Sequence, residues 1–152
     1  MSFFSLYNHF VWHTKGSVPF LKGDKEKQVW AIIRQIIIKS PDIYYVSVGG
    51  TANHVHVLVY SKSTISVAKM AQRIKGASSE AINKKRLFKF RFAWQHEYGC
   101  VSVDSRNLKV IQNYISNQKI HHARRTEIKH FESTDFRDFN FDHAWGNDDD
   151  EI

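Results

Sequence analysis

Two pairs of side chains in this sequence have types and spacing that suit metal-assisted chemistry, and the first pair consists of histidines. His54 and His56 stand one residue apart in the stretch NHVHVLVYS, which otherwise alternates like a β-strand. Side chains two residues apart on a strand point to the same face, with α-carbons about 6.6 Å apart. Two neutral imidazoles at that spacing can chelate one metal ion. The alternative, which this triplet alone leaves standing, is a pair of half-exposed strand histidines without a chemical role.

The second pair is Tyr114 and Gln118, which lie four residues apart. On a helix this spacing places both side chains on one face. A tyrosine hydroxyl is a nucleophile once its proton is removed, and a glutamine carbonyl oxygen is a neutral hard ligand. The alternative is a core tyrosine beside a solvated glutamine. However, Leu108, Ile111 and Ile115 already supply an apolar stripe for packing, so the core does not obviously need Tyr114.

Alternating strand and helix patterns supply the elements that must position these side chains. Val55, Val57 and Val59 would face a helical layer, which leaves the histidines on the opposite face of their strand. Gly49 and Gly50 predict a turn that joins the two central strands as a hairpin. The expected elements, in order, are a strand over 6–14, a helix that starts near 24 and stops at Pro41, strands over 43–50 and 54–60, a helix over 64–85, short strands over 87–95 and 99–104, and a helix over 105–122.

This order of elements predicts an α+β fold of the ferredoxin-like (RRM-like) type, a split βαβ sandwich. Its antiparallel sheet would carry two helices on one face. A C-terminal helix bearing Tyr114 would be added to this unit. We therefore expect a domain over residues 1–126 and an acidic, aromatic C-terminal tail over 127–152.

Charge is distributed unevenly along the chain, whose net charge is +7. Residues 1–126 contain 20 basic and 6 acidic residues, whereas residues 127–152 contain 2 basic and 9 acidic residues. A basic body suits a polyanion, because Lys and Arg that neutralise phosphates release condensed counterions. The alternative is a solvated surface without a polyanionic partner.

The basic residues expected to contact a polyanion gather mainly where the second helix ends. Phe88, Phe90, Phe92 and Trp94 alternate with them, and we expect these aromatic side chains to form the buried face of a strand rather than a stacking surface. Contact with a polyanion is assigned instead to the charges, which are Lys15, Lys75, Lys84, Lys85, Arg86, Lys89 and Arg91.

Composition narrows the setting in which the protein works. A chain of 152 residues can bury a core of its own. Cys100 is the one cysteine, so no disulfide can form within the chain and no Cys-rich zinc module is available, which favours an intracellular setting. The N-terminal stretch MSFFSLYNHF does not have the pattern of a signal peptide, and no membrane span is expected.

Several of these motifs together carry a family resemblance. The stretches FVWHTK, NHVHVLV, RIKGASSEAINKK, FAWQHEYGCVSVD and VIQNYISNQKIHH follow one another in family order. With them the chain resembles the small single-tyrosine HUH transposases of bacterial insertion sequences, TnpA-type enzymes that move DNA as single strands, and their relatives linked to repetitive extragenic palindromes. The resemblance covers about residues 6–122. It departs from the family at Thr51 and Ala52, where Met-Pro is frequent, and the acidic tail is not part of the motif set.

The resemblance implies roles for the four candidate residues. His54, His56 and Gln118 would hold a divalent metal, Mg²⁺ or Mn²⁺, and Tyr114 would attack the scissile phosphate. The product would be a 5'-phosphotyrosine intermediate with a free 3'-OH, formed on single-stranded DNA at ends marked by hairpins. The seven basic residues would contact the DNA. The resemblance favours a homodimer, in which one chain's tyrosine helix can serve the other chain's histidines, whereas relatives linked to palindromes can work as monomers. It also implies a location at the nucleoid in a bacterial cytoplasm.

Other interpretations of the same residues stay open. The chain could be a non-catalytic or domesticated DNA-hairpin-binding regulatory module, or a metal hydrolase that uses water in place of Tyr114. Glu97 is a candidate extra metal ligand. His121 and His122 point in different directions on a helix and are interpreted as packing or phosphate neighbours. The acidic tail could fold over the basic surface and compete with DNA.

Overall fold

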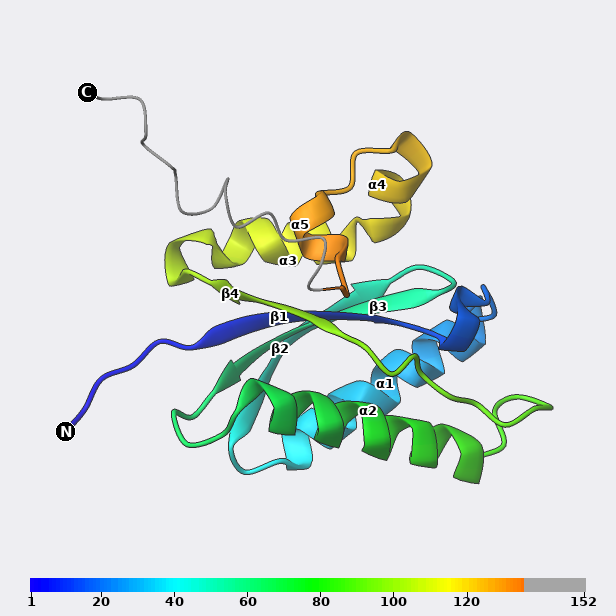
Figure 1. Ribbon diagram of the computed structural model, residues 1–152, viewed down its shortest axis with the longest axis horizontal. Coiled ribbons are helices and arrows are strands. Elements are labelled where there is room, and N and C mark those ends of the chain that lie inside the picture. Colours follow the sequence, from blue (N-terminus) through cyan, green and yellow to red (C-terminus); the bar gives the residue numbers. More distant parts are fainter. Residues whose placement is uncertain (136–152) are drawn as a thin grey trace.

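An antiparallel sheet forms the centre of the computed structural model, which describes residues 1–135. Its strand order is β2-β3-β1-β4, with two central and two edge strands. The strands are β1 (Tyr7–His13), β2 (Ile43–Gly50), β3 (His54–Ser61) and β4 (Gly99–Val103). Because β2 and β3 pair as a hairpin while β1 separates β3 from β4, the connectivity is that of the ferredoxin-like α+β sandwich, as the sequence predicts (Figure 1).

Two long helices, α1 (Asp24–Lys39) and α2 (Val67–Lys84), cover one face of this sheet (Figure 1). Helix α1 ends at Lys39, two residues before Pro41, because Ser40, which precedes the proline, is pushed out of the helical region. The Ser66 side chain caps α2 by accepting the backbone N–H of Lys69. Both helices bury an apolar stripe against Val55, Val57 and Val59, which face this layer as the sequence predicts.

Short helices lie on the opposite face, which is the face of the two histidines (Figure 1). After the 3₁₀ turn η2 (Ser105–Asn107) come α3 (Leu108–Ser116), α4 (Gln118–Arg124) and α5 (Lys129–Glu132). A second apolar cluster attaches this layer to the sheet, and its buried members are Leu58, Val103, Ile111 and Ile115. The sheet therefore separates a main core from a smaller one that carries the candidate tyrosine.

The expected strand over 87–95 is wrong. This segment is irregular, and within residues 1–135 its backbone pairing is limited to an isolated bridge between Thr14 and Trp94. The Asn83 side chain takes both backbone groups of Phe92, with its amide donating to the carbonyl at 2.9 Å and its oxygen accepting the N–H at 2.7 Å. The alternation also fails at Phe90, whose side chain is 50% exposed. The hydrogen bonds of the Phe92 backbone are thus made by a side chain instead of by a neighbouring strand.

The expected continuous helix over 105–122 is interrupted at Asn117, where the backbone leaves helical geometry (φ −103°, ψ 22°). Tyr114 consequently lies near the end of α3, and Gln118 is the first residue of α4. Among residues 1–135, no helix has both the length and the apolar character needed to cross a membrane.

Candidate active site

The two strand histidines lie side by side on the face of β3 that meets the short helices, and both are almost fully buried. His54 Nδ1 lies 2.7 Å from Asn53 Oδ1 and 2.9 Å from Thr51 Oγ1. His56 Nδ1 lies 2.8 Å from Nε2 of His9 on the neighbouring strand β1. Because each Nδ1 has a partner, the ring orientations are fixed and both Nε2 atoms are turned toward the same space.

Burial also sets the charge of the surrounding imidazoles. It lowers the pKa of His56, and it lowers that of His9 to about 3. The pKa of His13, whose ring stacks on His54 at 4.9 Å, is lowered to about 4, first by burial and then by the neighbouring His54. His9, His13 and His56 are therefore neutral at physiological pH. Neutral imidazole is the form that binds metals.

Gln118 reaches the histidines because of the break between α3 and α4. Its amide Nε2 donates to the backbone carbonyl of Tyr114 at 3.3 Å, which turns its Oε1 toward His54 Nε2, also at 3.3 Å. His122 Nε2 approaches the same Oε1 at 3.1 Å. The amide oxygen thus faces the space shared by the imidazole nitrogens.

Tyr114 is 4% exposed, and its ring stands nearly perpendicular to that of His56, with centroids 5.9 Å apart. Its hydroxyl donates to Glu132 Oε1 at 2.5 Å and accepts the backbone N–H of Ile128 at 2.9 Å. Burial, followed by the hydrogen bond to Glu132, raises the pKa of Tyr114 to about 12. The hydroxyl is therefore protonated at neutral pH and covered by the segment that contains α5.

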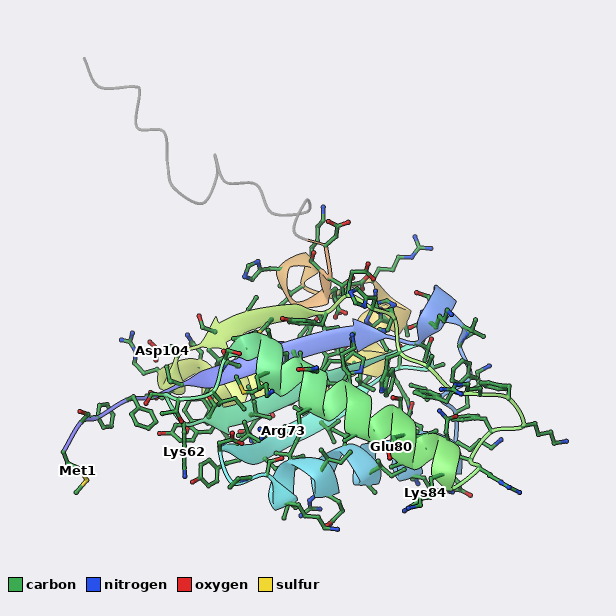
Figure 2. All side chains as sticks on the ribbon, turned by 60° about the horizontal axis from the view of Figure 1, so that its bottom comes forward. Met1, Lys62, Arg73, Glu80, Lys84 and Asp104 are labelled. Carbon is green, nitrogen blue, oxygen red and sulfur yellow. The ribbon has the colours of Figure 1, made fainter. Side chains whose placement is uncertain are left out.

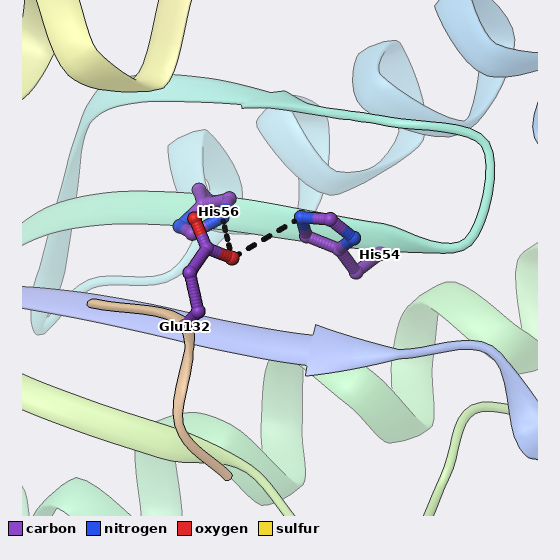
Figure 3. Close-up of side chains that lie close together, drawn as sticks. All are labelled: His54, His56 and Glu132. Atoms are coloured by element: carbon purple, nitrogen blue, oxygen red, sulfur yellow. Dashed lines mark hydrogen bonds and ion pairs between the residues drawn. The ribbon is translucent and has the colours of Figure 1, made fainter. Parts of the chain in front are cut away.

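Glu132 is a site residue that the sequence analysis did not find. Its Oε2 lies 3.1 Å from His56 Nε2 and 3.3 Å from His54 Nε2, so that the carboxylate stands between the two rings (Figure 3). Burial raises the pKa of this carboxyl, but hydrogen bonds with His54, His56 and Tyr114 outweigh burial and hold the pKa well below its usual range. No periodic signal marks Glu132, because α5 has only four residues.

Glu97, the extra ligand considered from the sequence, does not reach this site. It is exposed, and its backbone carbonyl accepts a hydrogen bond from Lys75 at 3.2 Å. The two adjacent histidines of α4 do point differently, as expected. His121 stacks on the Tyr114 ring at 4.7 Å, whereas His122 turns toward the Gln118 amide.

The donor set fits a divalent cation. One nitrogen each of His54 and His56 and one carboxylate oxygen of Glu132 lie within 4.8 Å of one another, and the Gln118 oxygen adds a neutral donor. Two imidazole nitrogens with two oxygens suit Mn²⁺, and also Mg²⁺ that keeps several water ligands.

The residues predicted to contact DNA do not all lie together. Arg86, Lys89 and Arg91 line one open groove at the end of α2, whereas Lys84 and Lys85 lie beside it on the last turn and cap of that helix. Two predicted contacts lie elsewhere. Lys15 is exposed in the 3₁₀ turn η1 (Lys15–Ser17), and Lys75 donates to the backbone carbonyl of His96 at 2.7 Å.

Comparison with known proteins gives one family and a set of similar folds. The family model described as "Transposase IS200 like" matches residues 2–118. A candidate transposase from Deinococcus radiodurans has a similar crystal structure, with a TM-score of 0.62 and 22% sequence identity over 77% of this chain and 93% of that one. A REP-associated tyrosine transposase bound to a REP hairpin is also similar, with a TM-score of 0.58 and 12% identity over 80% of this chain and 72% of that one. At such identities the structures show a shared fold. A comparison with curated proteins gave no match.

Proposed function

Because the chain belongs to the IS200-like transposase family, we propose that it cleaves and rejoins single-stranded DNA through a covalent bond between Tyr114 and a 5'-phosphate. One observation carries the proposal: the Tyr114 hydroxyl lies in the same buried space as His54, His56 and Gln118. Family membership supports transposase activity, and this constellation supports the tyrosine mechanism. The substrate we propose is DNA with a hairpin, since the second structural relative is bound to a REP hairpin.

The chain's own groups would perform the proton and phosphoryl transfers. The Tyr114 oxygen attacks the phosphorus, the bond to the 3'-oxygen breaks, and a 5'-phosphotyrosine forms with release of a 3'-OH. Glu132 Oε1, already hydrogen-bonded to the phenol, is the nearest acceptor for its proton, and the departing 3'-oxygen takes up a proton from solvent water. A 3'-OH can reverse the step and join new ends, because the phosphotyrosine keeps the energy of the phosphodiester.

His54, His56, Gln118 and Glu132 would hold the divalent cation. When bound, Mg²⁺ or Mn²⁺ would supply Lewis acidity at a non-bridging oxygen of the scissile phosphate. The role of the two histidines would be to present imidazole nitrogens in a fixed orientation, which the contacts of Asn53 and Thr51 with His54 support.

Assembly and location extend the same proposal. We keep the expectation of a homodimer, and note that in the single chain Tyr114 lies beside the histidines of its own chain. In a dimer with shared sites, α3 would make the same contacts across two chains. Action at nucleoid DNA in a bacterial cytoplasm follows from the proposed substrate.

A covalent-adduct assay tests the proposal. End-labelled single-stranded hairpin oligonucleotides from the DNA that flanks the coding region are incubated with protein and Mg²⁺ or Mn²⁺, then separated on a denaturing gel. We expect a labelled protein band that Tyr114→Phe abolishes and Tyr44→Phe, at a half-exposed strand position, retains. Cleavage without an adduct would make water the nucleophile and refute the tyrosine mechanism.

A second candidate function is a DNA-hairpin-binding regulatory module. The contacts that cover the Tyr114 hydroxyl favour this function. The hydroxyl oxygen accepts the backbone N–H of Ile128, and the hydroxyl hydrogen is donated to Glu132. Binding of the hairpin without any adduct, in either metal, would support this module against the transposase.

A further inference from the structure

The groove at the end of α2 lies on the opposite side of the sheet from Tyr114 and is built from residues that the catalytic site does not use. Its volume is about 1040 Å³, and it is open to solvent. One wall is the last turns of α2, where Glu80 and Lys84 mark the helix end in Figure 2. The other wall is the irregular segment over residues 86–93.

An exposed aromatic ring lies in this groove. Phe90 is 50% exposed, although the neighbouring rings of Phe88 and Phe92 are buried. The Phe90 ring stacks on Phe88 at 5.2 Å with an interplanar angle of 24°, and it meets Phe20 edge-on at 4.9 Å. An aromatic ring that rests on buried rings and still presents one side to solvent is a platform for another flat ring.

The backbone that carries this ring is held firmly. Asn83 fixes Phe92 through two hydrogen bonds, and Arg86 turns the chain out of α2 in a left-handed conformation (φ 51°). A residue with a side chain adopts this conformation only at some cost, so the contacts that follow must maintain it. The Phe90 platform is therefore preorganised, which lowers the entropy cost of binding.

The charges around the platform select a polyanion. Lys25, Arg86, Lys89 and Arg91 line the groove, with Glu80 as its one acidic lining residue. The Lys25 ammonium lies 5.1 Å from the Phe88 ring centre, so that the groove combines cationic and aromatic groups. Proteins that bind single strands combine these two features, with phosphates on the cations and bases on the rings.

From this platform and these charges, and resting on the proposed function, we propose that the groove holds an unpaired nucleobase of the DNA substrate stacked on Phe90. Arg86, Lys89 and Arg91 contact the flanking phosphates. A base within a duplex has both faces covered by its neighbours, so the platform takes a base that lies outside the paired stem. This assigns to Phe90 a role that its place in an alternating aromatic pattern did not predict.

The groove is joined rigidly to the catalytic histidines. The backbone of Lys15 donates to Ala93 at 3.0 Å, and that of Gln95 donates to His13 at 2.9 Å. His13 in turn pairs with His54 across β1 and β3. Figure 1 shows the loop after α2 and the β2–β3 turn at the same end of the sheet. A base bound at Phe90 would therefore fix the number of nucleotides between the groove and the phosphate that Tyr114 attacks.

Binding to a fluorescein-labelled dT12 oligonucleotide tests the proposal, with Kd measured by anisotropy for the full chain at several salt concentrations. We expect Phe90→Ala to weaken binding about 10-fold or more without changing the salt slope, because one stacked base is lost. Phe90→Tyr should restore affinity. Arg91→Ala should instead reduce the salt slope by about one. Ile38→Ala, at an equally exposed apolar position of α1, is the matched control and should bind like the wild type.

An oligonucleotide of the same length with abasic sites separates stacking from charge. The wild-type protein should bind it as weakly as Phe90→Ala binds dT12, and Phe90→Ala should not distinguish the two. If Phe90→Ala keeps its circular dichroism spectrum and its wild-type Kd, the groove does not hold a base. If Phe90→Ala weakens binding but no Tyr114 adduct forms, the proposed function is wrong and the groove proposal stands. If the adduct forms but Phe90→Ala binds like the wild type, the groove proposal is wrong and the proposed function stands.

Discussion

At Gly49 the sheet closely approaches α3, the helix that carries the proposed nucleophile Tyr114. A Cβ atom at this position of β2 would lie 2.4 Å from the backbone oxygen of Ile115 and 2.9 Å from its Cγ2. Ordinary contacts of a Cβ begin at 3.4 Å, so α3 must move away by about 1 Å to accept alanine. Ile115 follows Tyr114 directly, and Gly49 pairs with His56, so the movement would separate the proposed nucleophile from the proposed metal ligands.

We therefore expect Gly49→Ala to disturb catalysis more than folding. Overpacking of this kind costs about 1–3 kcal/mol in the free energy of unfolding. A displacement of the nucleophile by about 1 Å can lower the rate on the order of 100-fold. The measurements are urea unfolding and the initial rate of the phosphotyrosyl adduct at saturating oligonucleotide, so that a change in affinity does not enter.

Gly76→Ala is the matched control, because nothing lies within 4 Å of the added Cβ in the middle of α2. It should raise the free energy of unfolding by roughly 0.5–1 kcal/mol and leave the adduct rate unchanged. Wild-type adduct rates in Gly49→Ala, together with a wild-type unfolding midpoint, would refute the reasoning that this close approach positions Tyr114.

Three further predictions concern stability and reactivity. Ser78→Ala should lower the free energy of unfolding by about 1–3 kcal/mol, measured by urea, because the Trp94 indole N–H that donates to Ser78 at 2.8 Å is left buried without a partner. Burial raises the pKa of the Cys100 thiol to about 12, so iodoacetamide at pH 8 should modify it much more slowly in the native protein than in urea; equal rates would contradict the burial. The hydrogen bond from Arg73 lowers the pKa of Asp42, so this carboxylate stabilises the fold above its unfolded pKa of about 3.9 and the contribution is lost as the pH falls further. The urea midpoint of Asp42→Asn should therefore fall less steeply with acid than that of the wild type.

The sheet and its two long helices could be predicted because their signals are local. Val55, Val57 and Val59 alternate with the histidines, and this period of two is enough to assign each set to a face. The same reasoning wrongly placed Phe90 on the buried face of a strand. Alternating apolar residues indicate which side chains meet an apolar surface, but they do not indicate whether a neighbouring strand is available for pairing. Asn83 satisfies the backbone there, and no pattern in the sequence shows that hydrogen bond.

The site could be predicted only in part for a related reason. His54 with His56 and Tyr114 with Gln118 are each neighbours in sequence, so spacing alone pairs them. Glu132 joins His56 from 76 residues away, through a helix too short to show a period. The break at Asn117 contains neither glycine nor proline and is stabilised by the Gln118 amide, a contact that exists only in the folded chain.

The unequal size of the two apolar clusters has a consequence for cooperativity. Within residues 1–135, the cluster that holds α3 has four buried members, against eighteen in the cluster between the sheet and α1 and α2. Segments with few buried apolar contacts open at lower free energy than the whole protein unfolds, so the backbone amides of α3 should exchange with deuterium before those of β1 or β3. The layer with Tyr114 should therefore open as a separate unit while the main core stays folded.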